Sequence, residues 1–157
     1  MTVTVDIDNQ SQSSHCPDEE SCQAWISKAL DVLGRENNLE LSLRFVDEKE
    51  SAELNQRYRD KPGATNVLSF PSEASEDVAE QIGFYPLGDI VICPAILEAE
   101  AREQGKALPD HWAHILIHGL LHLCGHDHQQ NDQAKAMESL EIEILKTLGI
   151  ANPYLVG

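Results

Sequence analysis

The sequence predicts a small α/β or α+β domain, with about five helices packed against a mixed sheet of about four strands. Three observations indicate this class: strand-like runs alternate with amphipathic helical patterns, no repeat or linker divides the chain, and one helical segment is apolar on nearly every side. The length of 157 residues suits a single domain spanning residues 1–157. A chain of this size is long enough to bury a hydrophobic core without stabilising disulfides or metals.

Four segments carry strand signals, namely β-branched or aromatic residues in alternating or continuous apolar runs. They cover residues 3–8, 41–46, 65–70 and 87–93. Pro62 and Gly63 mark a turn before the third strand, and Pro71 closes that strand. The strand order is not readable from these patterns.

Five segments show helical periodicity, with apolar residues recurring every three to four positions. They run over 18–33, 47–58, 94–104, 109–125 and from Asn131 or Asp132 into the C-terminal apolar stripe. Pro94 and Pro109 each open a helix, a position that favours proline. Residues 72–86 are expected to form a long acidic loop or a fragment of helix.

Composition indicates a soluble globular protein, with 41% hydrophobic and 24% charged residues. No run of 18 apolar residues occurs, so we expect no transmembrane helix. The N-terminus lacks the features of a signal peptide, which favours the cytoplasm. The four cysteines form no CxxC pair and are most simply reduced thiols.

The formal net charge of −16 argues against a protein that coats nucleic acid non-specifically. A nucleic-acid role would need a local basic patch or a partner that delivers the substrate. Arg57, Arg59 and Lys61 form one short basic cluster, and arginine suits bidentate contact with phosphate. From the residues alone, a solvated helix end, where the dipole favours cations, is the preferred interpretation of this cluster.

Six of the seven histidines lie between positions 111 and 128. His111, His114, His118 and His122 fall within an arc of about 80° on one helix face, at 100° per residue. His118 and His122 are four residues apart, so their rings can converge on one ion at roughly 2.0–2.1 Å. His114 lies about 12 Å along the helix from His122 and cannot easily share that ion. The third ligand must therefore come from elsewhere.

Gly125 provides the route for a third ligand, because a glycine just past a helix end can turn the chain back. His128 follows three residues later, completing the pattern H-x3-H-x2-G-x2-H. This is the ligand spacing of metzincin proteases, in which a glutamate follows the first histidine, whereas Gly119 stands here. We therefore predict one zinc-type ion on His118, His122 and His128. Three neutral histidines leave a fourth position open, as in catalytic zinc sites.

The neighbouring residues admit more than one role. His111 and His114 are expected to support the ligands or cap the helix. His126 is an exposed turn residue, a supporting group or a competing ligand, and Cys124 is expected to be a core thiol. Asp127 is a candidate for orienting an imidazole.

Several motifs, in this order along the chain, resemble the YbeY family of bacterial metal-dependent endoribonucleases. They are VDEKESAELNQRYRDKPGATNVLSFP (46–71), LGDIVIC (87–93), HGLLHLCGHDH (118–128) and EIEILKTLG (141–149). Two departures are visible: His126 stands where the family usually has tyrosine, and Asn66 where many members have aspartate. Neither alters the three predicted ligands.

The resemblance implies zinc on His118, His122 and His128, with Arg59 as a catalytic residue. It also implies cleavage of single-stranded RNA in ribosomal RNA maturation and ribosome quality control. The expected partners are ribosomal RNA and the ribosome or its associated proteins, with no membrane and no DNA. Two alternatives are a ribosome-associated binding factor with a structural metal and a peptidase-like metal hydrolase, against which Gly119 counts.

Overall fold

The computed structural model describes residues 2–35, 37–73, 76–126 and 130–155. Its elements in chain order are β1 (Val3–Asn9), α1 (Glu19–Val32), β2 (Leu39–Phe45), α2 (Glu48–Arg59), β3 (Val67–Pro71), α3 (Glu76–Ile82), β4 (Tyr85–Ile92), α4 (Pro94–Gln104), α5 (Leu108–Leu123) and α6 (Asn131–Thr147). The elements predicted from periodicity are present, with ends shifted by a few residues. Helix α3 lies in the acidic segment where the sequence left a loop or a helix fragment open.

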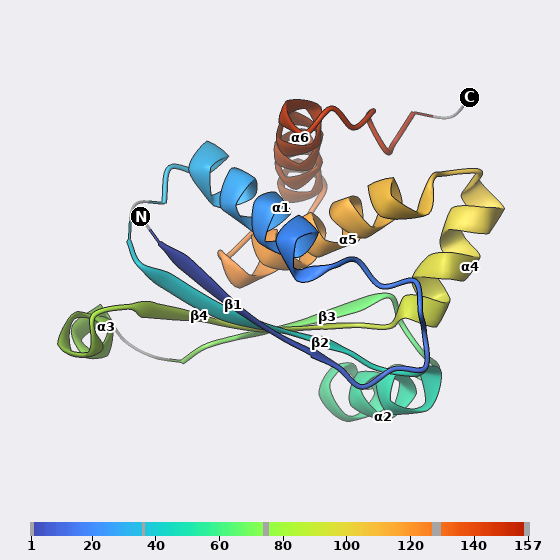
Figure 1. The fold of residues 1–157 in the computed structure, drawn as a ribbon, viewed down its shortest axis with the longest axis horizontal. Helices are drawn as coiled ribbons and strands as arrows, with labels where there is room; N and C mark the ends of the chain where they lie inside the picture. Colours follow the sequence, from blue (N-terminus) through green and yellow to red (C-terminus); the bar gives the residue numbers. More distant parts are fainter. Residues whose placement is uncertain (1, 36, 74–75, 127–129, 156–157) are drawn as a thin grey trace.

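The strands form one mixed sheet in the order β1-β2-β4-β3. β1, β2 and β4 run parallel, and β3 is antiparallel to β4. Figure 1 shows α1 and α5 over one face of this sheet, α6 beyond them, and α2 on the opposite side of the strands. The predicted α/β class with a four-stranded mixed sheet is therefore confirmed.

Helix α5 is the central helix that its composition predicts. Trp112, Leu116, Ile117, Leu120 and Leu121 are almost completely buried and belong to the main hydrophobic cluster. Because helices α1, α4 and α6 and strands β3 and β4 all contact α5, burial of its polar side chains is costly unless the fold gives them partners.

Gly119 lies where α5 packs tightly against the sheet. A Cβ atom at this position would lie 3.0 Å from Cγ2 of Val67 and 3.1 Å from Cγ2 of Ile90. The hydroxyl of Ser69 on β3 also donates a hydrogen bond of 2.8 Å to the Gly119 carbonyl oxygen. Glycine therefore lets the helix lie against β3, with His118 beside the strand. A glutamate in place of Gly119 would point into the sheet.

Across the described part of the chain, no helix is long and apolar enough to cross a membrane. Cys16, Cys22, Cys93 and Cys124 are all free thiols, as the sequence predicts.

Candidate active site

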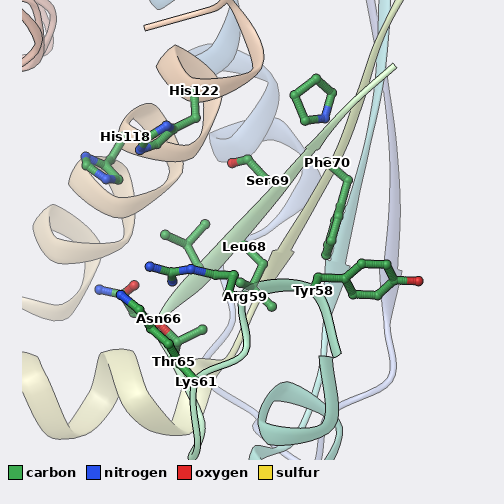
Figure 2. Close-up of a pocket in the computed structure, with 12 residues that line it drawn as sticks. Tyr58, Arg59, Lys61, Thr65, Asn66, Leu68, Ser69, Phe70, His118 and His122 are labelled. Atoms are coloured by element: carbon green, nitrogen blue, oxygen red, sulfur yellow. The ribbon is translucent and has the colours of Figure 1, made fainter. Parts of the chain in front are cut away.

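A pocket of about 740 Å³ opens between the C-terminal end of α2, strand β3 and helix α5. The residues that line it are Tyr58, Arg59, Lys61, Thr65, Asn66, Val67, Leu68, Ser69, Phe70, Pro71, His118 and His122. Figure 2 shows the Arg59 side chain entering from one wall, with His118 and His122 on the helix opposite. The fold thus brings Arg59 and two predicted ligands, about sixty positions apart in sequence, to one cavity.

His118 and His122 project from successive turns of α5 into this pocket. Their ring centroids are 4.9 Å apart, with an angle of 75° between the ring planes. This is the neighbouring placement expected of histidines four residues apart on one helix face.

Glu141 of α6 is a hydrogen-bonded partner of His118. The His118 Nδ1 atom lies 3.1 Å from Oε1 of Glu141, and His114 Nε2 lies 2.9 Å from the same oxygen. The Tyr154 hydroxyl donates to both carboxylate oxygens at 3.0 Å. Glu141 is only 1% exposed, so these donors replace the water that the carboxylate loses on folding.

The protonation of Glu141 follows from this environment. Burial raises the pKa of the carboxyl, but the hydrogen bonds from His114 and His118 and the electrostatic attraction of these two rings together outweigh burial and lower the pKa to about 2. The group is therefore a carboxylate at neutral pH, and it accepts a hydrogen bond from the protonated Nδ1 of His118. With Nδ1 engaged in this way, Nε2 is the ring nitrogen of His118 suited to binding a metal.

His114 contacts Glu141 and the Tyr154 hydroxyl, the latter at 3.2 Å, and it is not among the residues that line the pocket. This placement behind Glu141 is compatible with the supporting role expected of His114. It holds the carboxylate that in turn holds His118.

His111 is connected through Glu100 to Asn66, a residue of the pocket lining. Its Nε2 atom lies 3.0 Å from Oε1 of Glu100, and the Asn66 side-chain amide donates to the two oxygens of that carboxylate at 3.4 and 3.3 Å. The amide nitrogen of Asn66 is thereby turned toward Glu100. Its carbonyl oxygen is left as the polar atom that can face the pocket, where Asn66 forms part of the lining.

The third predicted ligand, His128, lies outside the described residues, as does Asp127. Among the residues that are described, no group of three or more histidine, cysteine or acidic side chains is arranged to hold a metal ion. The chain leading to His128 turns as predicted: Gly125 has φ +94°, and the half-buried His126 donates its backbone N–H to the Leu121 carbonyl.

Cys124, beside this turn, packs partly buried against the main hydrophobic cluster. Burial raises the pKa of its thiol, so it stays protonated at neutral pH. Both observations agree with a core thiol.

The basic wall of the pocket is set by the end of α2. Asp60 follows the helix in the left-handed conformation, with φ +54°, and turns the chain so that both Arg59 and Lys61 line the cavity. Arg57 is not part of this lining, and its guanidinium carbon lies 5.3 Å from the centre of the Tyr58 ring.

Sequence reasoning overlooked Glu141 and Tyr154. Glu141 carried a usable signal, because it falls on the apolar stripe of α6 with Met137, Ile144 and Leu145, all buried. A charged residue in such a stripe must have a buried partner. Tyr154 follows the last helix in an irregular segment, where no periodicity indicates what its side chain contacts.

Comparison with known proteins identifies relatives of this chain. The family model described as Endoribonuclease YbeY matches residues 6–149. Proteins named Endoribonuclease YbeY from Colwellia psychrerythraea, Cellvibrio japonicus and Stenotrophomonas maltophilia are 44%, 47% and 50% identical. These alignments cover 99%, 96% and 85% of this chain, and 99%, 82% and 82% of the relatives.

The same fold occurs in a solved structure. A solution structure of a Thermotoga maritima protein superposes with a TM-score of 0.54 and 24% identity, over 97% of this chain and 99% of that one. At this level of identity the likeness concerns the fold alone. The family model and the relatives together cover nearly the whole sequence, and on that basis this chain belongs to the YbeY family.

Proposed function

We propose that this protein is a zinc-dependent endoribonuclease that cleaves single-stranded RNA, with residues 1–157 forming one metallohydrolase domain. The observation that carries the proposal is the shared pocket of Arg59, His118 and His122. Its described lining contains two histidines, an arginine and a lysine, and no carboxylate. In a chain of net charge −16, a pocket of this kind favours an anionic substrate such as a phosphodiester.

The donor set of the pocket fits a zinc-type ion. His118 and His122 provide imidazole nitrogens from one helix face, and the Glu141 carboxylate orients His118 in the manner typical of zinc-bound histidines. His128 would complete a set of three ligands for one ion per chain. When bound there, zinc would supply Lewis acidity toward a phosphoryl oxygen.

The remaining residues would bind the phosphate or hold the metal-binding histidine in place. Arg59 would bind the phosphodiester and stabilise the negative charge that builds up at phosphorus in the transition state. Lys61, on the same wall, adds a second positive charge. Glu141 and His114 would keep the His118 ring in place throughout.

The geometry disfavours a peptidase. The general base of the metzincins follows the first histidine, and here that position is Gly119, whose missing Cβ faces Val67 and Ile90 of the sheet. A binding factor with a structural metal is disfavoured by the open cavity in front of His118 and His122.

The cellular role extends the same proposal. We place the enzyme in the cytoplasm, acting on ribosomal RNA during maturation and quality control, with the ribosome or its associated proteins as partners. The names of the relatives support RNA cleavage. The four free thiols are compatible with a reducing compartment.

The test is cleavage of labelled RNA by pure protein, as prepared, after chelation and after zinc repletion. We expect single-stranded RNA to be cut and duplex RNA to be largely spared. A casein-type substrate should remain intact. Elemental analysis should find about one zinc per chain, as the three-histidine site implies.

Three variants make this test decisive. His118→Ala, His122→Ala and His128→Ala should each lose most of the metal and the activity, whereas His114→Ala should keep the metal. Full metallation of His128→Ala would overturn the assignment of His128 and make His126 the candidate for the third ligand. Cleavage that survives unchanged in all three ligand variants would come from a contaminating nuclease and would refute the proposal.

A further inference from the structure

We infer that Tyr58 and Phe70 form a stacking site for one nucleobase of single-stranded RNA, beside the phosphate site at Arg59. This inference rests on the proposed function and identifies where the substrate is held. Both rings line the same pocket as Arg59, His118 and His122. Figure 2 shows the two rings next to each other, on the side of the pocket away from His118.

The two rings form a braced pair. Their centroids are 5.0 Å apart with an interplanar angle of 71°, an edge-to-face arrangement that aromatic rings favour. Phe70 of β3 packs against a small hydrophobic cluster of Val46, Leu68 and Val91. Because Phe70 is anchored in this way, the ring of Tyr58 is supported by the sheet although it lies at the surface.

Tyr58 itself is 56% exposed, which is unusual for a large aromatic side chain that serves only packing. An exposed ring next to cationic side chains is what a nucleobase requires, since bases stack on aromatic faces while the backbone follows positive charge. The guanidinium carbon of Arg57, 5.3 Å from the Tyr58 ring centre, adds a planar cation to the same surface.

The order Tyr58-Arg59 places a stacking ring and a phosphate ligand on adjacent residues. A nucleotide whose phosphate contacts Arg59 therefore has a base, its own or that of a neighbour, within reach of Tyr58. In a duplex the bases are already stacked and paired, so a base can occupy this site only at the free-energy cost of unstacking and unpairing it. The stacking site thus gives a physical reason for preference toward single strands.

The experiment compares the binding of a short fluorescent single-stranded RNA with that of an abasic oligomer of the same length and backbone charge. Dissociation constants are measured by anisotropy with chelator present, so that no cleavage occurs. Wild-type protein should bind the RNA more tightly than the abasic oligomer by roughly 5- to 150-fold, the scale of one stacked base. Tyr58→Ala should lose most of this preference, and Tyr58→Phe should retain it.

Ile82→Ala is the matched control, because Ile82 is also an exposed apolar residue, at 49%, but lies on α3 and is not among the residues that line the pocket. Thermal melting should show that all variants are folded. If Tyr58→Ala keeps the full preference for bases, the stacking site is refuted while the endoribonuclease proposal stands. If wild-type protein binds both oligomers equally, the stacking site is refuted as well. Absence of RNA cleavage by zinc-loaded wild type would instead refute the proposed function, whatever the binding preference.

Discussion

The Nδ1 atom of His118 lies 3.1 Å from Oε1 of Glu141, so the first histidine of the pocket is tied to the last helix of the fold. The same carboxylate also accepts hydrogen bonds from His114 and from the Tyr154 hydroxyl, and Glu141 is only 1% exposed. A buried charge with three donors is a rigid element, because removing any one donor leaves part of the charge unsatisfied. The orientation of His118 therefore depends on residues that never touch the pocket.

Glu141→Gln should weaken zinc binding by roughly 10- to 100-fold, the scale for losing a carboxylate that orients a metal-binding histidine. An amide presents a weaker acceptor to His118 and adds a donor that competes for the same position. The measurement is zinc competition against a chromogenic chelator. Glu143→Gln, on the exposed face of the same helix, should bind zinc as the wild type does. Equal zinc affinity in both variants would mean that the carboxylate does not act on the metal site.

Glu141 should also make the unfolding free energy dependent on pH in the acidic range. Its pKa is about 2 in the folded protein against an ordinary value of 4.5 for a glutamate, so the folded state favours the charged form. The resulting stability is fully present above pH 4.5 and is lost as the pH falls toward 2. The shift corresponds to roughly 3 kcal/mol. Denaturant titrations of the zinc-free protein between pH 2.5 and 6 should show a steeper loss for wild type than for Glu141→Gln; parallel curves would contradict the assignment.

Tyr154→Phe removes only the hydroxyl that donates to both oxygens of Glu141. The unfolding free energy should fall by about 1–3 kcal/mol, as for loss of a hydrogen bond to a buried charge. Zinc affinity should fall by less than in Glu141→Gln, since His114 still holds the carboxylate. Urea denaturation measures the first effect and chelator competition the second. Tyr58→Phe, which removes the hydroxyl of an exposed tyrosine, should leave both quantities unchanged, and a Tyr154→Phe protein of wild-type stability would show that the hydroxyl is dispensable.

Much of the fold was predictable because its local signals agree with its tertiary structure. The alternating residues of β1 and β2 and the proline at the start of α4 and of α5 all appear where the periodicity places them. The order β1-β2-β4-β3 was not predictable, because strand order depends on contacts between distant segments. Helix α3 was ambiguous, since the acidic segment around it carries no clear apolar face.

The pairing of two histidines in the pocket was predictable, because it depends only on their spacing along one helix. His118 and His122 were identified from their i, i+4 relation, and the structure places them together in the pocket. Arg59 was identified from the family resemblance, because charge clustering alone favoured a solvated helix end. Glu141 was missed, since its role depends on the packing of α6 against α5, which no local pattern specifies.

Gly119→Ala should destabilise the protein although alanine favours helices. The added methyl would lie 3.0 Å from Val67 and 3.1 Å from Ile90, and forcing a methyl into a packed core costs about 1–3 kcal/mol. The gain in helix propensity is about 1 kcal/mol, so a net loss of roughly 1 kcal/mol is expected. Thermal melting should show a decrease of about 2–4 °C.

A double-mutant cycle with Val67→Ala checks the cause. If the clash with Val67 is responsible, Gly119→Ala should cost less in the Val67→Ala background than in wild type. Strictly additive effects of the two substitutions would show that contact with Val67 is not the cause of the destabilisation.

The Arg59→Ala variant distinguishes the enzyme hypothesis from that of a binding factor with a structural metal. Arg59 lies on α2, on the wall of the pocket opposite His118 and His122, and arginine does not bind zinc, so metal content and melting temperature should match wild type. If the guanidinium stabilises charge on the phosphate, the single-turnover rate should fall by roughly 10²- to 10³-fold. Arg59→Lys keeps the charge but loses the planar fork, so it should recover only part of the rate.

Arg57→Ala is the comparison that makes the Arg59 result specific. It removes the same charge two residues earlier, from a side chain that lies by Tyr58 and does not line the pocket. Loss of general positive charge would slow both variants alike, whereas a positioned phosphate contact predicts a much larger effect for Arg59→Ala. The rates are to be measured on one labelled RNA at matched zinc content. A wild-type rate for Arg59→Ala would remove Arg59 from the mechanism and would favour a binding factor whose apparent activity comes from a contaminant.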